Sequence, residues 1–141
     1  MSDRIQRRVP EMSPAETAWL ACALDAEGTI YVTNSGRGRL IPRIEVTNTD
    51  PRFINKCHQI THVGFIFMKR GQKINWKPCW YWRSGSSHDI HGILRQVLPY
   101  LIIKKSQAEI VLTFIEMRAS RTKVEVNALR NQLAALNQRG V

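Results

Sequence analysis

Two acidic residues, Asp25 and Glu27, follow an apolar stretch that runs from Trp19 to Leu24. The pattern predicts a helix over about 13–27, which places both carboxylates at its carbonyl end. Acids are disfavoured there by about 0.3–1 kcal/mol each, because the helix macrodipole is negative at that end. A carboxylate held beside unpaired helix carbonyls suits a hard divalent cation. The alternative is that Asp25 is a local capping acid and Glu27 a solvated side chain.

The elements that position these acids have clear boundary signals. Ser13, Pro14 and Glu16 are spaced as a capping box with proline at the first helical position. Gly28 is the expected stop, since glycine adopts a left-handed conformation at no cost. The stretch between them is apolar on every side, which predicts a helix buried all round. In a chain of 141 residues, a partner helix from a second subunit would explain such burial.

The nine residues Leu-Ala-Cys-Ala-Leu-Asp-Ala-Glu-Gly, from Leu20 to Gly28, resemble the motif that names the LAGLIDADG homing endonucleases. Cys22 stands where the family usually has glycine, and its larger side chain should hold two paired helices further apart. Glu27 stands where aspartate is commoner and keeps the charge. A second stretch, Leu98 to Glu109, resembles the start of a later helix in the same family.

The resemblance implies a single-motif, homodimeric, site-specific double-strand DNA endonuclease that uses Mg²⁺, or Mn²⁺ or Ca²⁺ in its place. It implies that Glu27 binds the metal, and the Ala26 carbonyl at the same helix end is the expected second ligand. Lys104 would lie near the scissile phosphate, Asn48 would position the nucleophilic water, and Arg52 would support that water network. Two alternatives remain open: Lys104 as a solvated lysine, and Asn48 as a strand-ending or capping residue.

The pairing of two first helices is expected to use a face of small residues at four-residue spacing. The predicted interface residues are Ala18, Trp19, Cys22, Ala23 and Ala26. Pairing two copies would bring two carboxylate sites to the dimer axis, one for each DNA strand.

Charge is concentrated in one part of the chain. The net charge is +10, and residues 28–83 contain ten basic and two acidic residues, which account for +8 of it. A basic surface confined to one region indicates nucleic-acid binding. The three cysteines, Cys22, Cys57 and Cys79, have no C-x-x-C spacing and are expected to be reduced thiols. No run has the length of a membrane span, and an intracellular protein is expected.

Alternating and helical patterns predict an α+β fold of αββαββα type: a four-stranded antiparallel sheet with helices packed on one face. A basic, mobile arm is expected over 1–12, the endonuclease domain over 13–118, and a linker and helix over 119–141. The predicted strands are 29–35, 39–47, 65–70 and 76–83, and Pro42 indicates an edge or weakly paired position. Trp76, Trp80 and Trp82 share one parity and are assigned to the core side. The predicted later helices are 51–62, 86–100, 105–117 and one that carries Leu129, Leu133 and Leu136.

The polar face of the two hairpins is expected to enter the major groove, where arginine can bond guanine and glutamate can accept from cytosine. Arg70, Lys73 and Lys77 near one hairpin tip are expected to hold phosphates. The remaining predicted DNA contacts are Tyr31, Thr33, Ser35, Arg37, Arg39, Arg43, Glu45, Phe67, Lys69, Cys79, Tyr81 and Arg83. A homodimer would present this face twice, so a long, near-palindromic duplex is expected. An RNA-binding intron maturase and a non-cleaving DNA-binding protein on the same fold remain alternatives.

Overall fold

The computed structural model describes residues 8–36, 38–73, 75–117 and 123–139. Helices and strands alternate in the predicted order, and a short 3-10 turn, η2, precedes α4. The elements are α1 Pro14–Glu27, β1 Gly28–Asn34, β2 Leu40–Asn48, α2 Pro51–Thr61, β3 Phe65–Lys69, β4 Cys79–Ser84, α3 Ser87–Val97, η2 Leu98–Tyr100, α4 Lys105–Met117 and α5 Lys123–Arg139.

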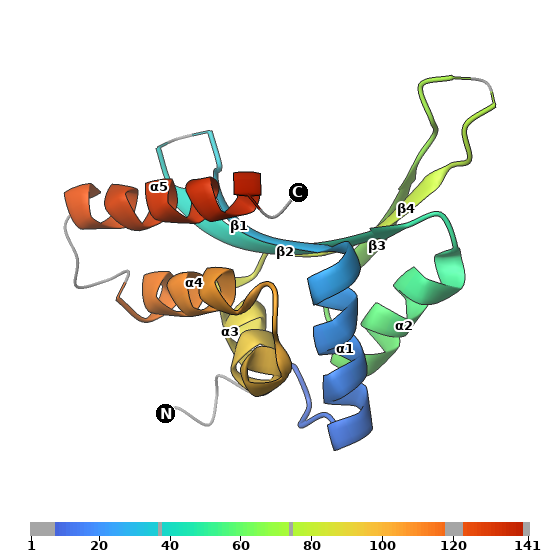
Figure 1. The fold of residues 1–141 in the computed structure, drawn as a ribbon, viewed down its shortest axis with the longest axis horizontal. Helices are drawn as coiled ribbons and strands as arrows, with labels where there is room; N and C mark the ends of the chain where they lie inside the picture. Colours follow the sequence, from blue (N-terminus) through green and yellow to red (C-terminus); the bar gives the residue numbers. More distant parts are fainter. Residues whose placement is uncertain (1–7, 37, 74, 118–122, 140–141) are drawn as a thin grey trace.

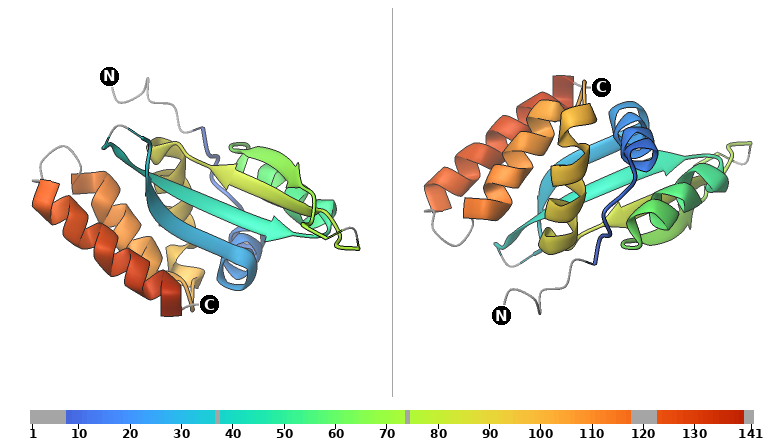
Figure 2. Two further views of the ribbon diagram at one scale, coloured as in Figure 1. Left: turned by 90° about the horizontal axis from the view of Figure 1, so that it is seen from above. Right: turned by 90° about the horizontal axis from the view of Figure 1, so that it is seen from below.

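The four strands form one antiparallel sheet in the order β1-β2-β4-β3, so the two hairpins are joined through β2 and β4. Helices α1 to α4 lie on one side of the sheet (Figure 1). The opposite face is uncovered when the molecule is seen from above (Figure 2, left). The predicted α+β architecture is therefore confirmed.

The last helix, α5, lies beside the edge strand β1 and packs on α4 (Figure 1). The Asn137 side-chain amide donates a hydrogen bond of 3.0 Å to the Ile30 carbonyl on that strand, and Leu133 is buried. Covering the strand in this way removes an edge that could pair with another chain.

Strand alternation divides the sheet as predicted. Ile30, Ile44, Val46 and Trp82 are completely buried on the helix side. Pro42 lies in the part of β2 that pairs with β1 but extends beyond the pairing with β4, so its missing N–H is tolerated.

The predicted start of the fourth strand is wrong. Strand β4 begins at Cys79, and Trp76 lies in the preceding turn with 54% of its surface exposed. The prediction relied on Trp76 having the same alternation as Trp80 and Trp82. That alternation continues through the turn, although the backbone there is not part of the sheet.

Helix α1 begins at the predicted capping box, with the Ser13 hydroxyl accepting from the Glu16 N–H and the Glu16 carboxylate accepting from the Ser13 N–H. It ends at Gly28, but the expected left-handed conformation is wrong, because Gly28 is extended (φ −100°, ψ 162°). A Cβ at this position would lie 2.7 Å from both the Cα and the carbonyl oxygen of Leu24. Glycine is required because β1 leaves the helix directly against its last turn.

The prediction that α1 is buried on every side is wrong for the single chain. Its buried residues are Thr17, Leu20, Ala21, Ala23 and Leu24, which face the protein's own core. Ala18, Cys22 and Ala26 are exposed and form a stripe of small residues along the opposite side. Within the described part of the chain, no other segment covers this apolar stripe.

The expected mobile arm is also wrong where residues 8–12 are described. Val9 and Met12 belong to the hydrophobic core, and the Gln96 side chain bonds both the Met12 N–H (2.8 Å) and the Pro10 carbonyl (3.0 Å). This segment therefore packs on α3, on the helix side of the sheet (Figure 1). The expected boundary at 118 and the link that follows it lie outside the described residues. In the described part of the chain, no helix is long and apolar enough to cross a membrane.

Candidate functional site

The two acids at the end of α1 have different environments. The Asp25 carboxylate accepts three backbone hydrogen bonds, from the N–H groups of Ile102 (2.9 Å), Ile103 (3.1 Å) and Lys104 (2.9 Å). It therefore anchors the segment that leads into α4 against the end of α1. The alternative that Asp25 is a local capping acid is therefore wrong, because its partners lie 77–79 residues away in the chain.

Glu27, the last residue of α1, is exposed. Within the described ranges, its carboxylate has no hydrogen-bond or ion-pair partner. Gly28 pairs with Val46, so Glu27 lies where β1 begins and β2 is about to end. The Ala26 carbonyl belongs to the same final turn, whose carbonyl groups lack partners along the helix.

Lys104 lies at the same end of α1, because its backbone N–H is bonded to Asp25. It is only 8% exposed, whereas the adjacent Lys105 is exposed. The alternative that Lys104 is a solvated lysine is therefore wrong. Keeping a lysine largely out of water costs free energy unless its charge serves a partner.

Asn48 and Arg52 lie in the turn between β2 and α2, where polar groups bond one another. The Asn48 side-chain carbonyl accepts from the Asp50 N–H (2.8 Å), so the strand-ending role is observed. Arg52 donates from Nη2 (2.7 Å) and Nε (3.1 and 3.2 Å) to the Asp50 carboxylate. These hydrogen bonds from Arg52 are the largest cause that lowers the pKa of Asp50 from 3.8 to about 2.

The structure thus brings three of the four predicted catalytic residues to one end of the sheet. Glu27 and Lys104 are joined through Asp25 and the end of α1, and Asn48 ends the strand that pairs beside Glu27. Arg52 is near Asn48 in the chain, but its side chain is 88% exposed and is bonded to Asp50.

The open face of the sheet carries the predicted recognition residues. The strand register aligns Tyr31 with Arg43, Glu45 with Arg83, and Phe67 with Tyr81. Thr33, Lys69 and Cys79 occupy the same parity. Ser35, Arg39, Arg70, Lys73 and Lys77 are exposed in the two hairpin turns, and Arg37 lies outside the described residues. The prediction omitted four residues of the same parity, which the alternation alone could have found: Thr29, Ile41, Thr47 and Phe65.

An aromatic and cationic cluster covers the β3–β4 half of this face. The rings of Phe67 and Tyr81 stack with centroids 4.8 Å apart and planes 5° apart. The Arg83 guanidinium lies 4.8 Å from the Phe67 centroid, and the Lys69 amine lies 5.1 Å from that of Tyr81. Arg83 also donates from Nε to Glu45 (2.6 Å). Two residues that the sequence suggested as separate base contacts are therefore one ion pair.

No family model matches this sequence, and no curated protein matches it. Solved structures do. The homing endonuclease I-CvuI, solved in complex with the I-CreI target, is 22% identical, with a TM-score of 0.70 over 86% of this chain and 82% of that one. The archaeal intron-encoded homing endonuclease I-Vdi141I, complexed with DNA, gives 0.71 at 14% identity over 86% and 84%.

The chain has the LAGLIDADG homing endonuclease fold. A third structure, the LAGLIDADG homing endonuclease I-SmaMI bound to cleaved DNA, gives a TM-score of 0.66 at 20% identity. It matches 94% of this chain but only 51% of its own. In this fold, the motif residues from Leu20 to Glu27 form the second half of α1, with Glu27 exposed at its end.

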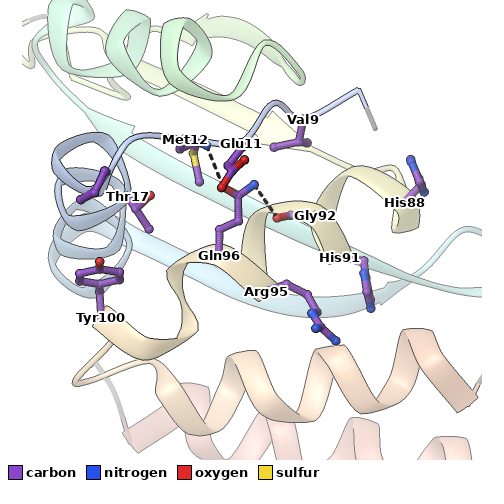
Figure 3. Close-up of a pocket in the computed structure, with 11 residues that line it drawn as sticks. Val9, Glu11, Met12, Thr17, His88, His91, Gly92, Arg95, Gln96 and Tyr100 are labelled. Atoms are coloured by element: carbon purple, nitrogen blue, oxygen red, sulfur yellow. Dashed lines mark hydrogen bonds between the residues drawn. The ribbon is translucent and has the colours of Figure 1, made fainter. Parts of the chain in front are cut away.

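A cavity of about 660 Å³ lies away from this site. It opens between the segment at residues 9–12, the first turns of α1, and α3 (Figure 3). Gln96 crosses it to bond Met12 and Gly92. The cavity is at the opposite end of α1 from Glu27, on the helix side of the sheet, and it is not part of the candidate functional site.

Only some of the predicted subunit-interface residues are exposed. Ala18, Cys22 and Ala26 are exposed, but Ala23 is 3% exposed and has no surface to offer a second helix. Trp19 is half-buried, because its ring packs on Phe53 at 5.1 Å.

Sequence reasoning missed two apolar side chains next to this stripe. Ile102 and Ile103 are 85% and 61% exposed, and their N–H groups are bonded to Asp25 of α1. The sequence does indicate them, because two apolar residues come directly before Lys104.

Proposed function

We propose that this chain is a homodimeric, metal-dependent, site-specific endonuclease that cuts both strands of a long, near-palindromic DNA duplex. The observation that carries the proposal is the state of Glu27. Its carboxylate is exposed and unpaired among the described residues, at the border of a basic sheet face, in a fold shared with homing endonucleases solved on DNA. A protein that only binds DNA gains nothing from a free carboxylate directed toward phosphates, because the two charges repel.

The donors at this site fit a hard divalent cation, although one chain provides few of them. Glu27 offers a carboxylate and Ala26 a backbone carbonyl, which are the oxygen ligands that Mg²⁺ prefers. No group of three or more His, Cys, Asp or Glu side chains that could hold a metal occurs in the described part of the chain. A complete ligand set therefore needs oxygens from the DNA and from a second copy. When bound, the metal supplies charge stabilisation at the phosphate and activation of water.

The chain's own residues have separate tasks in this proposal. Lys104 places an ammonium group near the scissile phosphate and offsets the negative charge that develops there. Asp25 acts indirectly, because its hydrogen bond to the Lys104 N–H fixes that residue against α1. The Asn48 amide lies at the end of β2, where it can orient a water molecule, and Arg52 contributes positive charge beside it.

A second copy completes the site through the exposed side of α1. Small side chains allow two helices to approach closely, and the stripe formed by Ala18, Cys22 and Ala26 is unoccupied within the described chain. Ile102 and Ile103 extend it with apolar surface that a monomer would leave in water. Both isoleucines are attached to the segment that holds Lys104, so the subunit contact and the catalytic end of α1 are continuous.

The experiment that tests the proposal starts from a randomised duplex library, from which the full-length chain selects its target. A plasmid carrying the selected sequence is then incubated with the protein and MgCl₂. We expect linear product from a cut in both strands at the selected site. Selection without cleavage would show a non-cleaving DNA-binding protein, and failure to select any duplex while structured RNA is bound would favour the maturase alternative; either result would overturn the proposal.

A further inference from the structure

Phe65 is an exposed aromatic residue on the sheet face that the proposed function assigns to DNA. Its register partner is Arg83, and its parity matches that of Phe67. It is 53% exposed, on a face whose other large side chains are mostly polar or covered. An exposed ring on a basic surface indicates a negatively charged ligand that also has an apolar group where it meets the ring.

The cluster beside it fixes the orientation of this ring. Phe65 stacks on Phe67 with centroids 5.5 Å apart and planes 29° apart, and Phe67 is in turn held between Tyr81 and Arg83. Only the outermost ring of the series keeps a large open surface. The ring therefore has little conformational freedom to lose when a ligand covers it.

Register also places Phe65 in one row across the sheet. Thr29 pairs with Glu45, Glu45 with Arg83, and Arg83 with Phe65. Thr29 comes two residues after Glu27, so the row leads from the nuclease end of α1 to the edge strand β3. Adjacent strands are about 4.8 Å apart, which places Phe65 directly beside the Glu45–Arg83 ion pair on this face.

We infer that Phe65 is a specificity-determining residue that contacts the 5-methyl group of a thymine, on the β3 side of the Glu45–Arg83 ion pair. The inference rests on the proposed function and deepens it. The thymine methyl is the apolar group that the major groove displays, and phenylalanine is among the side chains that contact it. Lys69 and Arg83 lie over the neighbouring Phe67 ring and attract the duplex, while the Phe65 ring itself selects for the methyl group.

The test uses the duplex selected by the full-length chain. Each thymidine is replaced in turn by deoxyuridine, which lacks only the methyl group, and affinity is measured in EDTA so that no strand is cut. We expect one symmetric pair of positions at which wild-type binding weakens ~4-fold for each methyl removed. F65A should bind the thymine duplex more weakly and show no further loss with uracil at those positions.

M68A is the matched control, because Met68 is an exposed apolar residue of β3 whose parity is opposite to that of Phe65. It should keep the wild-type uracil profile. A flat uracil profile for the wild-type protein, or an unchanged profile for F65A, would overturn the inference; F65A weakening all duplexes uniformly would instead indicate a wedge between bases. Those results would leave the proposed function intact, whereas failure to select any duplex would refute both.

Discussion

The end of α1 and the end of β2 lie at the same end of the sheet, yet their polar side chains are held in opposite ways. At the end of β2, Asn48, Asp50 and Arg52 bond one another within five residues. At the end of α1, Asp25 reaches a segment 77–79 residues away, and Glu27 has no partner in the described chain.

This difference shows which polar side chains serve local structure and which are left for a functional role. The β2 turn uses its side chains to end a strand and begin α2, and each of them can be explained without a ligand. At the end of α1, one acid holds the segment that contains the buried Lys104, and the other acid is exposed. In the described part of the chain, no contact explains the exposed carboxylate of Glu27, so Glu27 is the residue that most requires a functional explanation.

The largest expected effect on stability comes from removing the structural acid. D25A leaves three N–H groups without their charged acceptor, and hydrogen bonds to charged groups contribute about 1.5–3 kcal/mol each. Because water can replace part of this, we expect the free energy of unfolding to fall by about 2–4 kcal/mol in urea denaturation. E27A is the matched control and should change it by less than about 0.5 kcal/mol. If D25A and E27A lowered the free energy of unfolding equally, Asp25 would not be the structural acid of the pair.

The next largest expected effect is on dimerisation, and it should be confined to the exposed apolar residues at the end of α1. I102S/I103S should weaken the dimer at least ~100-fold, because burying one such side chain is worth about 1.5–3 kcal/mol and the dimer would bury four. Sedimentation equilibrium measures this constant. M68S, at an exposed apolar site on β3, should leave it unchanged. A wild-type monomer at all concentrations would contradict the shared site.

The smallest effect concerns the β2 turn. In R52A the Asp50 carboxylate loses its guanidinium partner, which is the main cause of its low pKa. The pKa should rise from about 2 toward 3.8, and an NMR titration of the side-chain carboxyl carbon would show it. A midpoint that stays near 2 would mean that Arg52 is not committed to Asp50 and is free for a catalytic role.

Local patterns predicted the fold well. The capping box of α1, the start of α4 at Lys105, and the two faces of the hairpins follow from spacing and alternation. Trp76 shows where alternation fails, because parity continues through a turn that leaves the sheet. Gly28 was identified as the stop for the wrong reason, since the contact with Leu24 that excludes a side chain exists only once β1 is placed.

The site was less predictable, because its decisive contacts join distant segments. The three partners of Asp25 come after η2, and nothing in the residues around Asp25 identifies them. The pairing of Glu45 with Arg83 depends on the register between β2 and β4. Burial of Lys104 likewise follows from packing against α1, which the neighbouring exposed Lys105 gives no reason to expect.

The most direct test of the account compares E27Q with the wild-type protein on the selected duplex in MgCl₂. Glutamine keeps the size and removes the charge at an exposed position, so folding and target affinity should match the wild type within about twofold. The cleavage rate should fall at least ~10³-fold. Cleavage by E27Q at close to the wild-type rate would contradict the assignment of Glu27 as the metal-binding carboxylate.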